Sequence, residues 1–81
     1  MTTAETQQKI FTAIKAVSGK DVEVTLQTKL AEDLDLDAGE MVQIDERLEK
    51  EFNINLPDEA VAKSETVEDI VNLVNSKISN E

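Results

Sequence analysis

Apolar residues recur at helical spacing in three separate stretches of this 81-residue chain, and that periodicity most restricts its fold. A helix with one apolar face must bury it against another element. The predicted long helices span about Ala4–Val17, from Asp37 to about Phe52, and Thr66–Ile78. Pro57 cannot continue a helix, and a short helix over Asp58–Ala62 is expected after it.

Side chains suited to capping stand at the start of each long helix. In a capping box, one side chain bonds the backbone N–H three residues on, and that residue's side chain reaches back. The predicted pairs are Thr2 with Glu5, Asp37 with Glu40, and Thr66 with Asp69. These pairs support the predicted helix boundaries.

The connection over residues 19–36 is predicted to be a long ordered loop. Val22, Val24 and Leu26 alternate with polar residues as in a strand, but the sequence offers no second strand to pair with them. Three leucines are expected to bury themselves and pin this loop onto the helices: Leu30, Leu34 and Leu36. A loop of this length in a small domain usually has a function.

Together these features predict an all-α fold: a four-helix bundle with a short third helix and a long loop between helices one and two. One domain is expected to span residues 1–81, with no repeat or low-complexity tract. A chain this small has little room for an enzyme cleft.

Composition excludes several classes of function. Asp and Glu number 18 against 8 Lys and Arg, for a formal charge of −10, so binding to nucleic acid is not expected. The chain has no Cys, which excludes disulfides, and no His, which argues against zinc sites and the common general bases. No apolar run approaches the length of a membrane span, and no signal peptide is evident. We therefore expect a monomeric, cytoplasmic protein that is not an enzyme and holds no metal.

The acidic run before the second helix was tested as a calcium loop. Asp33, Asp35 and Asp37 match loop positions 1, 3 and 5. Position 6 is Ala38 where glycine is needed, and position 12 is Ile44 where a bidentate Glu is needed. Because an isoleucine cannot ligate calcium, the EF-hand interpretation is rejected.

An ordered set of short segments, at matching spacing over nearly the whole chain, resembles the acyl carrier protein family. The matching segments are Asp37-Ala38-Gly39, Val42-Gln43-Ile44, Leu48-Glu49, Phe52, INLPDE at 54–59 and TVEDIVNLV at 66–74. The resemblance implies a carrier of fatty-acid or polyketide-type biosynthesis. Such a carrier presents acyl groups, held as thioesters on 4′-phosphopantetheine, to partner enzymes.

The resemblance also exposes a departure at the attachment position. The family has a serine between residues corresponding to Asp37 and Gly39, and its hydroxyl is esterified to the phosphate of 4′-phosphopantetheine. Here that position is Ala38, which has no hydroxyl, so the cofactor is not expected to attach. Two explanations stay open: an engineered block that keeps the chain in its apo form, or a natural homologue that lost the arm and only binds partners.

By resemblance, the partners are phosphopantetheinyl transferase and acyl-transfer or condensing enzymes with basic patches. The start of the second helix would dock on them, with Asp37 and the expected contact residues Glu40, Met41, Glu46 and Glu49. Docking through exposed charges is expected to be sensitive to salt.

The resemblance likewise implies an acyl pocket between the second and third helices. Its expected lining is Leu48, Ile54, Ala60, Val61 and Val67. Asp45 and Ser64 would bring polar groups to its edge, which predicts a preference for short or polar cargo because an unpaired buried carboxylate is unfavourable.

A generic acidic helical interaction module, unrelated to carriers, is the remaining alternative. It explains the charge and the apolar stripes. It does not explain the long ordered loop, nor why Asp37, Phe52 and Pro57 stand at the spacing of the carrier family.

Overall fold

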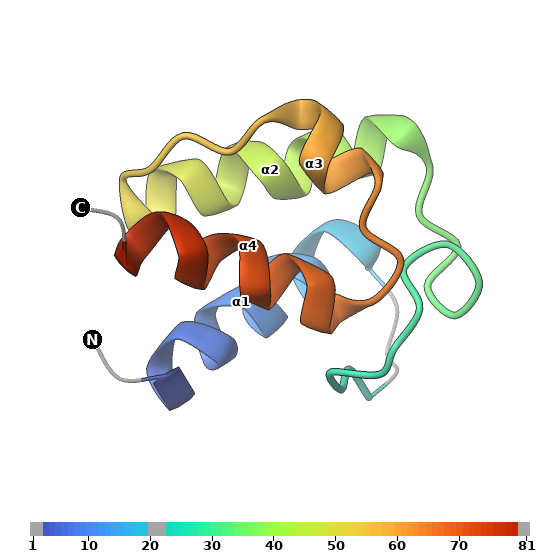
Figure 1. Cartoon of the computed structure of the whole chain (residues 1–81). Helices are drawn as coiled ribbons and strands as arrows, with labels where there is room; N and C mark the ends of the chain where they lie inside the picture. Colours follow the sequence, from blue (N-terminus) through green and yellow to red (C-terminus); the bar gives the residue numbers. More distant parts are fainter. Residues whose placement is uncertain (1–2, 20–22, 80–81) are drawn as a thin grey trace.

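The computed structural model describes residues 3–19 and 23–79, which form four helices (Figure 1). The helices are α1 (Thr3–Ser18), α2 (Ala38–Phe52), α3 (Asp58–Ala62) and α4 (Val67–Ser79). α1 contacts both α2 and α4, and the short α3 bridges α2 and α4. The predicted all-α bundle, with its short third helix and long first loop, is thereby confirmed.

The core between these helices is aliphatic, as the periodic stripes predicted. Its wholly buried residues on the three long helices are Ile10, Ile14, Ile44, Leu48, Val67, Ile70 and Val74. The two aromatic side chains, Phe11 and Phe52, are only half-buried and pack against this core. Removing aliphatic surface from water stabilises the fold by about 25 cal/mol per Å².

The loop between α1 and α2 is tied to the core by its three leucines and by backbone hydrogen bonds. Leu30, Leu34 and Leu36 are all buried, which confirms the prediction for them. The Leu30 N–H donates to the Glu65 carbonyl at 2.9 Å, and the Val67 N–H donates to the Thr28 carbonyl at 3.0 Å. The loop thus runs beside the segment that joins α3 to α4. Val22 lies outside the described residues.

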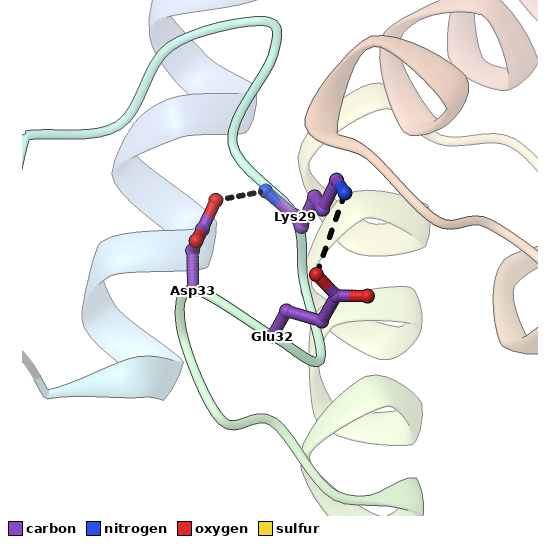
Figure 2. Close-up of polar contacts among 3 residues, drawn as sticks. All are labelled: Lys29, Glu32 and Asp33. Atoms are coloured by element: carbon purple, nitrogen blue, oxygen red, sulfur yellow. Dashed lines mark hydrogen bonds and ion pairs between the residues drawn. The ribbon is translucent and has the colours of Figure 1, made fainter.

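Acidic side chains shape the turn within this loop (Figure 2). The Asp33 carboxylate accepts a hydrogen bond from the Lys29 backbone N–H at 2.8 Å. The Lys29 ammonium reaches back to the Glu32 carboxylate at 3.4 Å. The acids that resembled a calcium loop in the sequence are therefore partly used to hold the backbone.

α2 begins with the predicted capping box. The Asp37 carboxylate accepts a hydrogen bond from the Glu40 N–H at 2.8 Å, and the Glu40 carboxylate accepts one from the Asp37 N–H at 3.1 Å. At the other end Asn53 takes a left-handed conformation with φ 54°, which ends the helix.

The pair at the start of α4 is confirmed as well. The Asp69 carboxylate accepts hydrogen bonds from the N–H groups of Glu65 and Thr66, and the Thr66 hydroxyl oxygen accepts one from the Asp69 N–H. These bonds lower the pKa of Asp69 below 3.8, with the Glu65 N–H the largest cause. The third predicted pair involves Thr2, which lies outside the described residues.

Candidate functional site

A hollow of about 440 Å³ lies between the first half of α2, α3 and the end of the long loop. This volume falls within the roughly 300–1,000 Å³ typical of small-molecule pockets. It is lined by Leu30, Ala31, Leu36, Asp37, Ala38, Met41, Val42, Asp45, Asp58, Glu59, Val61, Ala62 and Ser64. Most of the lining is therefore apolar, with a small set of acids and one hydroxyl.

One face of α2 forms a wall of this hollow. Ala38, Met41, Val42 and Asp45 line it, and their spacing of three, four and seven residues places them on one side of a helix. The wall extends over about two turns, roughly 10 Å along the helix axis. Val42 is 43% exposed, although it is apolar. The hollow therefore reaches from the start of α2 to its middle.

The start of α2 has the features of an anion site, and its first residue is an alanine. Free N–H groups and the positive end of the helix dipole favour a phosphate there. Ala38, the first residue of the helix, is exposed and carries only a methyl group, so no phosphoester can form on it. The Ser64 hydroxyl also lines the hollow, but it donates to the Ala60 carbonyl at 3.1 Å.

Asp45 is the unusual residue of the site. The sequence placed it at the edge of a pocket, whereas the structure leaves it only 1% exposed. No N–H or hydroxyl donor in the described part of the chain bonds to either oxygen of its carboxyl, and the Asp58 carboxyl can bond to it only when one of the two is protonated. Burial, followed by the neighbouring acids Asp58, Glu49 and Glu46, raises its pKa from 3.8 to about 7.

The predicted acyl-pocket residues lie in three different surroundings in the structure. Val61 lines the hollow. Leu48, Ile54 and Val67 are buried in the hydrophobic core and do not line it. Ala60 lines a separate depression against α4. The hollow therefore lies nearer the start of α2 than the resemblance implied.

Sequence reasoning missed most of the apolar lining of the hollow. Leu30 and Leu36 were assigned only to the core, and Ala31 and Ala62 were not considered. Their contribution depends on the path of the long loop and on how α3 lies against α2. The helical spacing of Ala38, Met41, Val42 and Asp45 was the one signal in the sequence that could have identified a wall.

The predicted docking residues also differ in their surroundings. Glu46 is exposed, while Met41 is half-buried and lines the hollow. Glu40 belongs to the capping box, and the half-buried Glu49 accepts a hydrogen bond from the Leu56 N–H at 2.9 Å. Of these residues, Glu46 is the acid most available to an approaching partner.

Residues 3–19 and 23–79 contain no cluster of three acids placed to hold a metal ion. No helix in this part of the chain combines the length and apolar character needed to cross a membrane.

Comparison with known proteins identifies the family. The family described as "Phosphopantetheine attachment site" matches residues 8–74. An acyl carrier protein of Rickettsia bellii is 36% identical over 69 residues, which cover 84% of this chain and 80% of that protein. An acyl carrier protein of Petrotoga mobilis is 34% identical over 79 residues, covering 91% and 93% respectively.

Solved structures agree with these relatives. A Mycobacterium tuberculosis protein described as an acyl carrier protein superposes with a TM-score of 0.81 at 25% identity, covering 88% of this chain and 96% of its own. The actinorhodin acyl carrier protein of Streptomyces coelicolor, in its acetyl form, superposes with a TM-score of 0.75 at 18% identity, and the match covers 91% of each chain. At this identity the likeness shows a shared fold alone. Acyl carrier proteins are non-catalytic carriers. The chain therefore belongs to the phosphopantetheine-attachment family and is a homologue of the acyl carrier proteins.

Proposed function

We propose that this chain is an acyl carrier scaffold of fatty-acid or polyketide-type biosynthesis, with Ala38 at the position of the attachment serine. The observation that carries the proposal is the place of Ala38. It is the first residue of α2, directly follows the Asp37 cap and lines the hollow, within a family match that spans residues 8–74. An arm attached there would begin at a site that favours phosphate and beside a space for cargo.

In this proposal the chain as written stays in its apo form. The cofactor of the family does not fit a methyl side chain, since there is no oxygen to bond to its phosphorus. The chain then keeps the carrier's fold and partner surface without carrying a thioester. Ala38 also supports a second candidate function, a natural homologue that has lost the arm and only binds partner proteins.

A loading assay tests the proposal. The chain is incubated with phosphopantetheinyl transferase and coenzyme A, and its mass is measured. The mass of the parent chain should stay unchanged, while Ala38→Ser should gain one phosphopantetheine group. The matched control Ala38→Ser with Ser64→Ala should gain the same group, because the Ser64 hydroxyl is engaged with Ala60.

Each other outcome of the assay has a clear meaning. Modification of the parent chain would show that the attachment site lies elsewhere. An Ala38→Ser chain that folds but gains nothing would favour the binding-only homologue, because the transferase would no longer recognise the helix.

The same proposal assigns partner docking to the exposed surface of α2. Glu46 provides an accessible negative charge for a basic patch, and the half-buried Met41 provides an apolar contact nearer the start of the helix. Glu46→Lys should weaken binding to a partner transferase several-fold at low salt, and the difference should shrink at high salt. The matched control is Glu68→Lys, an exposed acid on α4. Equal losses from both changes would mean that net charge, rather than this helix, directs recognition.

Glu40 and Glu49 are poorer positions for testing docking. Their carboxylates hold the α2 cap and the segment before α3, so reversing their charge would disturb the fold as well as the surface. We assign the cargo to the hollow beside α2, with Val61 as the contribution from α3.

A further inference from the structure

The charged side chains that line the hollow are acidic. Four acids line it, namely Asp37, Asp45, Asp58 and Glu59, and no lysine or arginine among residues 3–19 and 23–79 does. Three of them are exposed and can be hydrated, but Asp45 is 1% exposed. A buried carboxylate without a hydrogen-bond donor is strongly unfavourable unless it is neutralised or paired.

Two arrangements can satisfy this carboxyl. In the first arrangement, the Asp45 carboxyl is protonated and shares a hydrogen bond with the neighbouring Asp58 carboxyl. Two carboxyls can form such a bond only when one of them is protonated. In the second, a ligand in the hollow brings the missing donor. The first arrangement needs nothing from outside, but it leaves an acid in the wall of an otherwise apolar space.

We propose that the hollow takes an acyl group bearing a primary amine, and that Asp45 accepts the hydrogen bonds of that amine. An ammonium group supplies three donors and the positive charge that the lining lacks. A cargo ending in a carboxylate would meet four acids and no base. This inference rests on the proposed function, since it specifies the class of cargo for the same hollow in a chain with an attachment atom at residue 38, such as Ala38→Ser.

The position of Asp45 fits this role. It stands seven residues after Ala38 on the same face of α2, so a group tethered at residue 38 meets it after roughly 10 Å. Met41 and Val42 lie between the two and present apolar surface to the chain of the cargo. A chain of about that length attached at residue 38 and ending in an amine would therefore have its methylene groups against apolar side chains and its terminal amine at Asp45.

The absence of cysteine from the sequence allows a test without any transferase. The variant Ala38→Cys carries a single thiol, whose thiolate can attack the symmetrical disulfide of an acylated cysteamine, forming a mixed disulfide and releasing the other half as a free thiol. Two probes are compared: β-alanyl-cysteamine and butyryl-cysteamine. They have the same length and shape and differ only in having an ammonium or a methyl group at the end.

The β-alanyl adduct should melt about 5–10 °C above the butyryl adduct at neutral pH, as expected for one charge-assisted hydrogen-bonded pair in a domain of this size. The carboxyl carbon of Asp45 should shift in the NMR spectrum on amine attachment. In an Asp45→Asn background, which keeps the shape and removes the charge, the difference between the adducts should disappear.

A matched control places the thiol on the exposed face of the same helix, in Gln43→Cys. There the two adducts should melt together. A butyryl adduct as stable as the β-alanyl adduct would overturn the proposal. So would a preference for the amine that survives Asp45→Asn or appears equally at residue 43, since either would reflect general attraction to an acidic protein. Failure of the loading assay on Ala38→Ser leaves this test unaffected, so the two proposals fail separately.

Discussion

Between α1 and α4 the wholly buried side chains are aliphatic, whereas the space between α2 and α3 is a hollow lined by four acids. Ile10, Ile14, Ile70 and Val74 on the first pair of helices have no exposed surface. The second pair is separated by about 440 Å³ of space next to a buried, unpartnered carboxyl. The first region has the composition of a scaffold, and the second has the composition of a binding site.

Two consecutive residues of α2 show how one helix serves both regions. Ile44 is wholly buried in the aliphatic core, and Asp45 is 1% exposed in the wall of the hollow. Successive residues on a helix point about 100° apart, so neighbours in sequence meet different surroundings. Burial alone therefore does not distinguish core from site, but the chemistry of the buried side chain does.

Truncation in the two regions should have the largest and most unequal effects. Ile70→Ala should lower the free energy of unfolding by about 3 kcal/mol, because the closed core cannot collapse around the cavity. Val61→Ala, in the wall of the hollow, should lower it by about 1 kcal/mol, because less packing is lost there. Urea unfolding measures both. Equal losses would show that α3 packs as tightly as the core.

The carboxyl of Asp45 should make stability depend on pH. Its pKa is 3.8 when unfolded and about 7 when folded, so the folded chain holds the proton more tightly. The contribution of the protonated Asp45 carboxyl to the free energy of unfolding is fully present below about pH 4 and is lost as the pH rises to about 7. Asp45→Asn should therefore be more stable than the parent by on the order of 2–4 kcal/mol above pH 7, and nearly equal to it at pH 4.

Asp69 provides a control, because its contribution to stability should change with pH in the opposite direction to that of Asp45. Its pKa is lowered by backbone hydrogen bonds, so its contribution is present at neutral pH and lost as the pH falls below 3.8. Asp69→Asn should therefore destabilise the chain at pH 7. Asp58, Glu49 and Glu46 lie close enough to raise the pKa of Asp45, so urea midpoints should also be compared with those of Asp58→Asn. An advantage of Asp45→Asn that does not change with pH would contradict the assignment.

The caps should have smaller effects that are similar in both regions. Asp37→Ala at the hollow and Thr66→Ala at the start of α4 should each lower the free energy of unfolding by about 1 kcal/mol. Thermal unfolding measures this, with the exposed mid-helix change Glu46→Ala as a control. A much larger loss at Asp37 would indicate that the wall of the hollow depends on the cap.

The local features of the fold could be read from the sequence. The boxes Asp37–Glu40 and Thr66–Asp69 were predicted because each involves residues three apart along the chain. The helical stripes followed from periodicity, and the three leucines of the loop followed from the unfavourable exposure of large apolar side chains. The single domain and the docking role of α2 stay predictions.

The shape of the hollow was decided by tertiary structure. Leu30 and Leu36 line it because the loop is bonded to the α3–α4 connection at Glu65 and Val67, contacts that join residues more than thirty positions apart. The sequence alone determined that Asp45 is an acid beside an apolar stripe and that Ala38 has no hydroxyl. Only the packing of the loop and α3 against α2 decided that this acid is buried, because a side chain's access to water depends on residues distant in the chain.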